Sequence, residues 1–239
     1  AEKGSALAEK KDFSGAKELF ASSVEALTAR LEKAGLGAFG NGAVAEAAEV
    51  QGKKIDELRQ SHFSACKTAF EGLKSSKNKE EILPVTEMLK AFATLWPDSG
   101  EAAEAGKAVL FLDAVQNGAK AVLTIVSADF SATDSFLDTP DMKILLKQDG
   151  KTLLETKTVD NETRPVFGEK HEFTWDLGSH FTFVGLETGG MLGSDKEVFN
   201  VTVDAGGILG YKRLNGSLKS NGNSITVKLE TGIPESPWN

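Results

Sequence analysis

The chain has 239 residues, a formal net charge of −8, and a composition that is 40% hydrophobic and 26% charged, as in an ordinary soluble globular protein. Its acidic excess excludes a broad nucleic-acid-binding surface, because phosphate binding requires clustered Lys and Arg. No run of 18 apolar residues occurs, so we predict no membrane-spanning helix.

The single cysteine, Cys66, excludes an internal disulfide, and three histidines dispersed along the chain do not predict a zinc site. The sequence starts at Ala1, with neither Met nor a hydrophobic leader. This indicates either a processed organellar or secreted chain or a trimmed one, and the compartment stays open. We expect a protein that is soluble or peripheral at a membrane.

Residues 1–117 are predicted to form an α-helical bundle, because apolar residues recur there at intervals of three and four. Asp98-Ser99 predicts a helix start and Asn117-Gly118 a helix end. The expected helices are Gly4–Glu9, Ser14–Lys33, Val44–Leu73, Lys79–Leu95 and Ser99–Gln116.

The first two of these helices resemble a single tetratricopeptide repeat, in which small and large residues alternate so that two antiparallel helices pack closely. The resemblance covers about thirty residues, and a second copy at the required period is missing. A plain bundle that offers a face to protein partners is therefore the preferred interpretation. The residues that carry the resemblance are Gly4, Leu7, Phe13, Ala16, Phe20 and Val24.

Two short motifs in this half have both a functional and a structural interpretation. The glycines of residues 35–40 match G-x-G-x-x-G, but a helix precedes them where a dinucleotide site needs a strand, so we predict a helix-to-helix loop. His62 and Cys66 are four residues apart, as in a metal or thiolate–imidazole pair. Cys66 also fits one apolar stripe with Phe63, Phe70 and Leu73, in which a free Cys is a small hydrophobic residue, and we prefer that interpretation.

Residues 118–239 are predicted to form a β-sandwich, because short runs rich in Val, Ile, Thr and Phe alternate with turn signals such as Asp149-Gly150 and Asn221-Gly222. The predicted fold is thus two-domain, all-α followed by all-β, with eight antiparallel strands. The expected strands are Lys120–Ser127, Asp141–Lys147, Thr152–Thr158, His171–Leu177, His180–Leu186, Val198–Val203, Ile208–Leu214 and Ser224–Glu230.

Five passages of this half occur in a characteristic order. They are a first strand at Val122–Val126, an acidic loop, a second strand that begins Met142-Lys-Ile-Leu, the passage Lys157–Phe167, and Glu172-Phe-Thr-Trp175. On these passages, about residues 120–230 resemble a C2 domain, an eight-stranded sandwich that binds Ca²⁺ and phospholipid.

The resemblance implies Ca²⁺ ligands in two loops at one end of the sandwich. In the first loop these are Asp134 and Asp138, although Thr139 occupies one ligand place unless the loop is a residue shorter. In the second they are Glu187 and Asp195, where the family's aspartate-x-aspartate has become Glu187-Thr-Gly189. Four carboxylates suffice for one weakly held ion; the alternative is that they are ordinary acidic loop residues.

The same loops carry apolar side chains, Phe136 and Leu137 in the first and Met191 and Leu192 in the second. Apolar tips beside a cation site suit shallow insertion into a lipid interface or a partner's groove. The alternative is that they fold back onto the rim of the sandwich.

The sequence lacks G-x-S-x-G, a phosphate-binding loop, H-E-x-x-H and a Cys cluster, so we expect no enzyme activity. We expect a binding or adaptor protein whose C2-like loops dock on a membrane surface or a protein, with Ca²⁺ as its cofactor. The alternative is a Ca²⁺-independent structural subunit of a large assembly.

Overall fold

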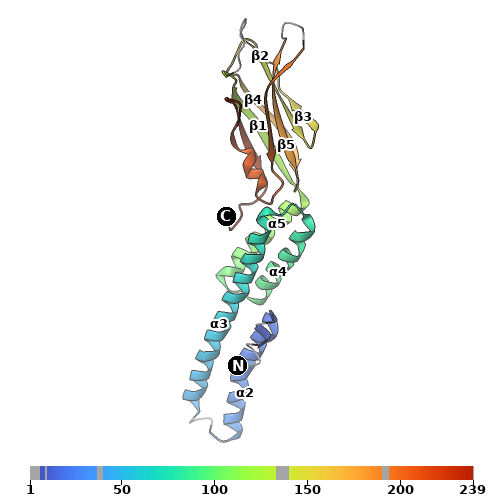
Figure 1. Ribbon diagram of the computed structural model, residues 1–239. Helices are drawn as coiled ribbons and strands as arrows, with labels where there is room; N and C mark the ends of the chain where they lie inside the picture. The colour runs from blue at the N-terminus through green and yellow to red at the C-terminus, as the bar shows by residue number, and fades with distance from the viewer. Residues whose placement is uncertain (1–5, 9, 37–39, 133–139, 190–193, 239) are drawn as a thin grey trace. The chain divides into compact units, whose positions relative to one another are not determined.

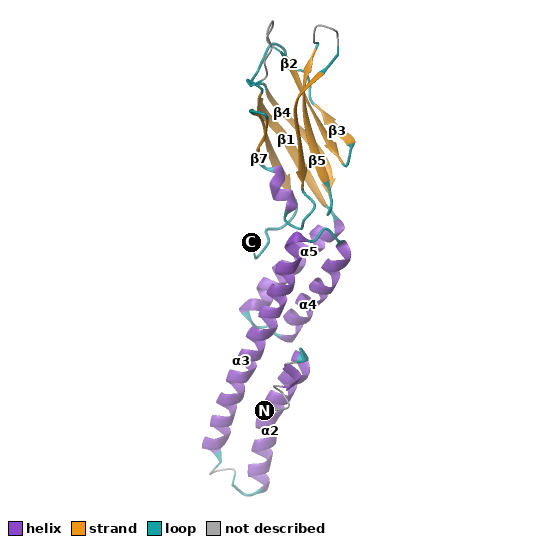
Figure 2. Ribbon diagram, viewed as in Figure 1, coloured by secondary structure: helices purple, strands orange, loops and turns teal. Residues whose placement is uncertain are grey.

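The computed structural model describes residues 6–8, 10–36, 40–132, 140–189 and 194–238. Helices occupy the chain up to Asn117 and strands follow (Figures 1 and 2). The chain divides into two compact units, one mainly helical and one that contains the strands. Unit 1 comprises Ala1–Glu71, Glu87–Gly106 and Trp238, and unit 2 comprises Gly72–Thr86, Lys107–Pro237 and Asn239.

The helices are α2 (Phe13–Lys33), α3 (Asn41–Gly72), α4 (Ile82–Leu95) and α5 (Gly100–Asn117), with 3₁₀ turns at Leu73–Ser75 and Lys79–Glu81. Of the helix expected at the N-terminus, residues 6–8 are described and are helical. Among the described helices, none combines the length and apolar character that crossing a membrane requires.

Polar side chains fix where two of these helices begin. The Asp12 carboxylate accepts a hydrogen bond from the Gly15 N–H at 3.0 Å, and Ser99 Oγ accepts one from the Ala102 N–H at 3.1 Å. Each bond satisfies an amide that lacks a partner in the first turn. The predicted start of α5 is thus confirmed, as is its end at Asn117, where Gly118 takes a φ of 76°. A domain division into 1–117 and 118–239 stays a prediction.

Among the described residues, eight strands form two four-stranded antiparallel sheets, which confirms the predicted sandwich. Sheet A has the order β4-β1-β8-β7 and sheet B the order β3-β2-β5-β6. Their inner faces hold fully buried side chains such as Leu123, Ile144 and Phe183. The strands are β1 (Ala119–Asp129), β2 (Asp141–Gln148), β3 (Lys151–Glu155), β4 (Val166–Trp175), β5 (His180–Thr188), β6 (Lys196–Asp204), β7 (Gly216–Ser220) and β8 (Asn223–Thr231).

One predicted strand is wrong. The sequence pattern predicts an extended Ile208–Leu214, but Gly210–Leu214 is a 3₁₀ helix, and the strand that completes sheet A is the short β7. The chain turns tightly here, since a Cβ added at Gly210 would lie 2.1 Å from the carbonyl oxygen of Ala205. The apolar residues of this run therefore pack from a helical turn.

We expect Gly210→Ala to lower the free energy of unfolding of unit 2 by about 2–3 kcal/mol, because the new methyl group meets backbone that has no rotamer with which to move aside. Gly232→Ala is the matched control, since its Cβ would come no closer than 3.7 Å to the Lys120 carbonyl oxygen. Urea unfolding followed by far-ultraviolet circular dichroism measures both. Equal stabilities of the two variants would contradict the tight contact at Gly210.

Candidate docking site at one rim of the sandwich

The two loops predicted to carry the site are joined to strands whose ends lie side by side. The first connects the end of β1 to the start of β2, and the second connects the end of β5 to the start of β6. In sheet B, Asp141 at the start of β2 pairs with Thr188 at the end of β5. Thr188 Oγ1 also donates a hydrogen bond to the Asp141 carbonyl oxygen at 3.3 Å. Strand ends from both connections therefore meet at one rim.

Most of the predicted site residues lie outside the described part of the chain, and their roles stay predictions. They are Asp134, Phe136, Leu137, Asp138, Met191 and Leu192. The structure places only Glu187 and Asp195 of the predicted set.

Glu187 lies near the end of β5, on the inner side of sheet B. It pairs with the buried Met142 on β2 and with Lys196 on β6, and directly paired residues share a face of a sheet. Its side chain is 15% exposed, and Oε2 lies 3.7 Å from the Lys196 Nζ. The ammonium group of Lys196 thus offsets the charge of the largely covered Glu187.

Asp195 lies on the outer side of the same sheet. Its Oδ2 is 2.8 Å from Nζ of Lys143, the residue after Met142, whose side chain therefore points to the opposite face. Lys143 also contacts Glu155 Oε1 of β3 at 2.9 Å, and its side chain is 18% exposed. Hydrogen bonds to Asp195 and then Glu155 raise the pKa of Lys143.

The structure thus does not bring Glu187 and Asp195 together. Each has a lysine partner, and the two carboxylates are directed to opposite faces of sheet B. A single Ca²⁺ needs its carboxylate oxygens to converge within about 2.3–2.6 Å of one point. These two residues do not fit such an ion jointly, and the described residues hold no group of three or more His, Cys, Asp or Glu side chains that converges on a metal position.

A further acidic residue lies at this rim, Asp129 at the end of β1, and the sequence prediction missed it. Its Oδ1 accepts hydrogen bonds from the Ser131 hydroxyl at 2.6 Å and the Ser131 N–H at 3.0 Å, while Arg164 Nε lies 3.2 Å from Oδ2. The hydrogen bonds from Ser131, and then the charge of Arg164, lower the pKa of Asp129. The pattern Asp-x-Ser after a strand is the signal that predicts such a turn.

The connection between β3 and β4 also reaches this rim. The Phe130 N–H donates to the Thr163 carbonyl at 2.8 Å, and the Asn161 N–H donates to Asp141 Oδ1 at 2.9 Å. These hydrogen bonds tie the connection between β3 and β4 to both strand ends that flank the first loop, the end of β1 and the start of β2.

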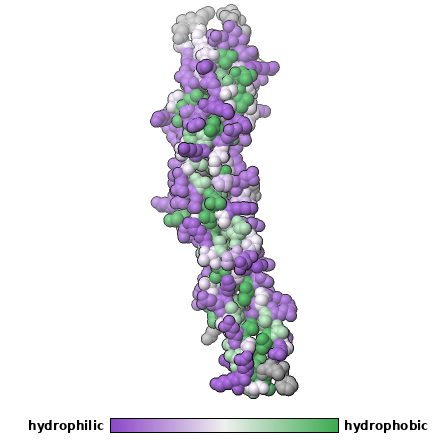
Figure 3. Space-filling model, turned by 180° about the vertical axis from the view of Figure 1, so that it is seen from behind, coloured by the Kyte–Doolittle hydropathy of each residue, from purple (hydrophilic) through white to green (hydrophobic). Residues whose placement is uncertain are grey.

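Apolar side chains do not gather into one large patch on the face of the molecule seen in Figure 3. Hydrophilic side chains cover most of the face seen in Figure 3, and hydrophobic ones occur in small patches between them. Exposed apolar side chains that are scattered over a surface are normal for a globular protein. The large exposed ones among the described residues are Leu19, Leu36, Val50, Leu83, Met88, Leu110 and Val166.

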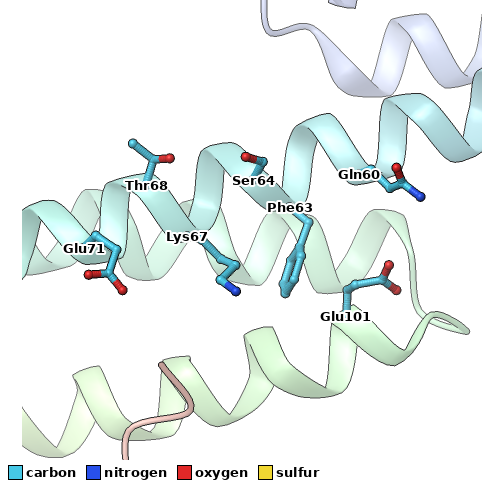
Figure 4. Close-up of a pocket in the computed structure, with 7 residues that line it drawn as sticks. All are labelled: Gln60, Phe63, Ser64, Lys67, Thr68, Glu71 and Glu101. Atoms are coloured by element: carbon cyan, nitrogen blue, oxygen red, sulfur yellow. The ribbon is translucent and has the colours of Figure 1, made fainter. Parts of the chain in front are cut away.

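Unit 1 contains a groove of about 440 Å³ beside α3. Phe63 and Lys67 project from α3 toward the side on which Glu101 of α5 lies, whereas Ser64 and Thr68 point away from it (Figure 4). The groove combines one aromatic ring with charges of both signs. It is a candidate surface for the protein partner expected at the helical half.

Solved structures that resemble this chain do so over about half of its length and at low identity. No protein-family profile and no curated protein matches the chain. Similar solved structures include human GIVD cytosolic phospholipase A2 in complex with methyl gamma-linolenyl fluorophosphonate, at 16% identity over 48% of this chain and 17% of that one, with a TM-score of 0.39. The chain thus spans under a fifth of that enzyme's length.

Two further similar structures are named for C2 domains. A structure of two C2 domains of Extended-Synaptotagmin 2 matches at 10% identity over 48% of this chain and 41% of that one, with a TM-score of 0.40. A C2 domain of plant Extended Synaptotagmin 1 matches at 11% identity over 47% of this chain and 93% of that one, with a TM-score of 0.37. The tetratricopeptide resemblance finds no support among these structures, which are distant likenesses over about half of the chain.

Proposed function

We propose that this chain is a non-enzymatic docking protein whose sandwich binds a membrane surface or a partner protein through the loops at one rim. The observation that carries the proposal is the pairing of Asp141 with Thr188, which makes the bases of the two loops neighbours. Apolar tips on two adjacent loops bury more surface jointly than either does alone. The helical unit would bind protein partners at its own surface.

A Ca²⁺ dependence of this docking would rest on Asp134 and Asp138, joined by no more than one of Glu187 and Asp195. Calcium bound at a rim supplies positive charge, which lowers repulsion between acidic loops and an anionic surface. The proposed Ca²⁺ site is thus smaller than the four carboxylates of the sequence prediction.

The alternative proposal is a Ca²⁺-independent structural subunit of a larger assembly. The ion pairs of Asp195 with Lys143 and of Glu187 with Lys196 favour it, because these lysines already supply the positive charge that a metal ion would bring. In that case the rim is a permanent contact surface for a neighbouring protein.

Co-sedimentation with phosphatidylserine–phosphatidylcholine vesicles separates the two proposals. If docking uses Ca²⁺, we expect the full chain to pellet in millimolar Ca²⁺ and to stay in the supernatant with excess chelator. The double variant Asp134→Asn, Asp138→Asn should then lose most of the pelleted fraction, since each exchange removes one carboxylate charge.

Asp149→Asn is the control, because Asp149 belongs to the turn between β2 and β3 and not to the two loops. If the pelleted fraction is the same with and without chelator, and the same for the double variant and the unaltered chain, the Ca²⁺ site is contradicted. A chain that never pellets would favour the structural subunit.

A further inference from the structure

The chain buries Trp238, a residue close to its C-terminus, among side chains of the helical unit. Trp238 belongs to unit 1 and is 6% exposed. Its ring meets those of Phe63 and Phe70 edge to face, with centroid separations of 5.6 and 5.1 Å and interplanar angles of 74° and 89°. Such geometry places ring edges against ring faces, which is the favourable arrangement for aromatic pairs.

The same site has polar groups placed for an indole and not for a plain phenyl ring. The Trp238 Nε1–H donates a hydrogen bond to Glu104 Oε2 at 3.0 Å. Lys67 Nζ lies 5.7 Å from the Trp238 ring centroid and 5.8 Å from that of Phe63, within cation–π range of both. We call Phe63, Lys67, Phe70 and Glu104 the indole socket.

The indole socket continues into open surface. Phe63 and Lys67 also line the groove of about 440 Å³ shown in Figure 4, together with Gln60, Glu71 and Glu101. The groove and the contacts of Trp238 therefore share two residues of α3, Phe63 and Lys67. A buried aromatic anchor beside a recess with a polar rim is the arrangement of a peptide-binding surface.

We propose that the indole socket is a binding site for a Trp-bearing peptide segment, that Trp238 is its resident ligand, and that the C-terminal segment of a second copy of this chain binds it in trans. The segment bound in the socket is part of this chain. The same segment of a second copy can therefore make the same contacts with Phe63, Phe70 and Glu104. Pro234 and Pro237 restrict the backbone before Trp238, which lowers the entropic cost of ordering a free segment on binding.

The first experiment tests the socket with a fluorescent peptide that spans residues 231–238, added to the full-length variant Trp238→Ala. We expect saturable 1:1 binding by fluorescence anisotropy, and binding to the unaltered chain weaker by at least about tenfold, because its tethered tail competes at an effective concentration in the millimolar range. A peptide with Ala in place of Trp should not bind. Equal binding of the Trp peptide to both proteins would overturn the proposal, since the peptide would then lie elsewhere.

The second experiment tests the source of the ligand by sedimentation of an equimolar mixture of Trp238→Ala and Glu104→Ala. The first variant offers an empty indole socket, and the second offers a tail whose own socket has lost its hydrogen-bond acceptor. We expect a pair of about 51 kDa, twice the 25.4 kDa of one chain, that neither variant forms alone. A mixture that stays monomeric at concentrations where the peptide binds would overturn exchange between copies.

A third measurement does not depend on whether the variants fold. In the unaltered chain, amide hydrogen exchange of residues 235–238 should be faster than that of residues 66–70 on α3, because a separable tail opens without unfolding the helix. Exchange of both segments at one common rate would mean that Trp238 is an inseparable part of the core, and would overturn the proposal.

Discussion

Trp175→Ala should lower the free energy of unfolding of unit 2 by about 3–5 kcal/mol, a loss typical of deleting a fully buried large aromatic side chain. Trp175 ends β4 with no exposed surface. Its Nε1–H donates to the Ala205 carbonyl at 3.3 Å, and its ring meets that of Tyr211 edge to face at 5.7 Å. One side chain thus joins a strand of sheet A to the turn and 3₁₀ helix that follow β6.

Urea unfolding followed by the circular dichroism of the sheets measures this loss, with two variants for comparison. Trp175→Phe keeps much of the aromatic ring but leaves the Ala205 carbonyl without this donor. We therefore expect it to lower the free energy of unfolding by about 1–2 kcal/mol. Val166→Ala on the same strand should change stability by less than about 0.5 kcal/mol, because Val166 is 74% exposed. Similar losses in all three variants would refute the special position of Trp175.

Acidification from pH 7 to about pH 4 should weaken the helical unit through His62. Burial lowers the pKa of His62 to about 4 from an ordinary value near 6.5. Between these two pH values the unfolded chain binds a proton that the folded chain does not. The contribution of neutral His62 to the free energy of unfolding is therefore fully present above about pH 6.5 and is lost as the pH falls toward 4. One group with this shift accounts for about 3 kcal/mol.

The cause lies in what surrounds the imidazole. His62 is 7% exposed, its Nδ1 accepts a hydrogen bond from Trp96 Nε1–H at 3.2 Å, and its ring stacks on Phe13 at 4.0 Å with an interplanar angle of 4°. Phe92 meets it edge to face at 5.1 Å. A proton on Nδ1 would break the bond from Trp96 and leave a charge among aromatic rings.

His62→Gln removes the titrating group and isolates its share of the pH dependence. The slope of the unfolding free energy against pH reports how many protons the chain takes up on unfolding. Between pH 4 and 6.5, we expect this number to be smaller by up to one in His62→Gln than in the unaltered chain. His171→Gln, a change at a half-buried strand residue, is the matched control. Helical circular dichroism in urea follows the transition, and an unchanged slope in His62→Gln would contradict the assignment.

Periodicity in the sequence predicts most of the fold because the core residues follow it. Cys66 and Phe70 on α3 and Leu73 just after it are buried as predicted, and His62 is buried with them. Gly35 and Gly40 lie between α2 and α3, with a helix on each side as predicted, whereas residues 37–39 lie outside the described part of the chain. The strand β7 was missed because Gly216–Ser220 has only one large apolar side chain, Leu218, and so shows no alternation.

The rim site could be predicted less well, because it depends on register and not on pattern. Loop order along the chain predicts that Glu187 and Asp195 belong to one connection. Only the pairing of Glu187 with Met142 and the contact of Asp195 with Lys143 show that they face opposite sides of sheet B. A shift of one residue in register exchanges the faces, and the sequence does not specify it at the ends of strands.

The turns of the sandwich have a consequence for the order in which its strands pair. Asp149-Gly150 and Asn221-Gly222 join β2 to β3 and β7 to β8, with φ values of 50° and 83° in the first and 50° and 79° in the second. These left-handed residues match the twist of a two-residue hairpin, so both hairpins should form within microseconds. The pairing of Ala121 with Thr231 joins residues 110 positions apart, and closing so long a loop makes the assembly of β1 with β8 the slow event of folding.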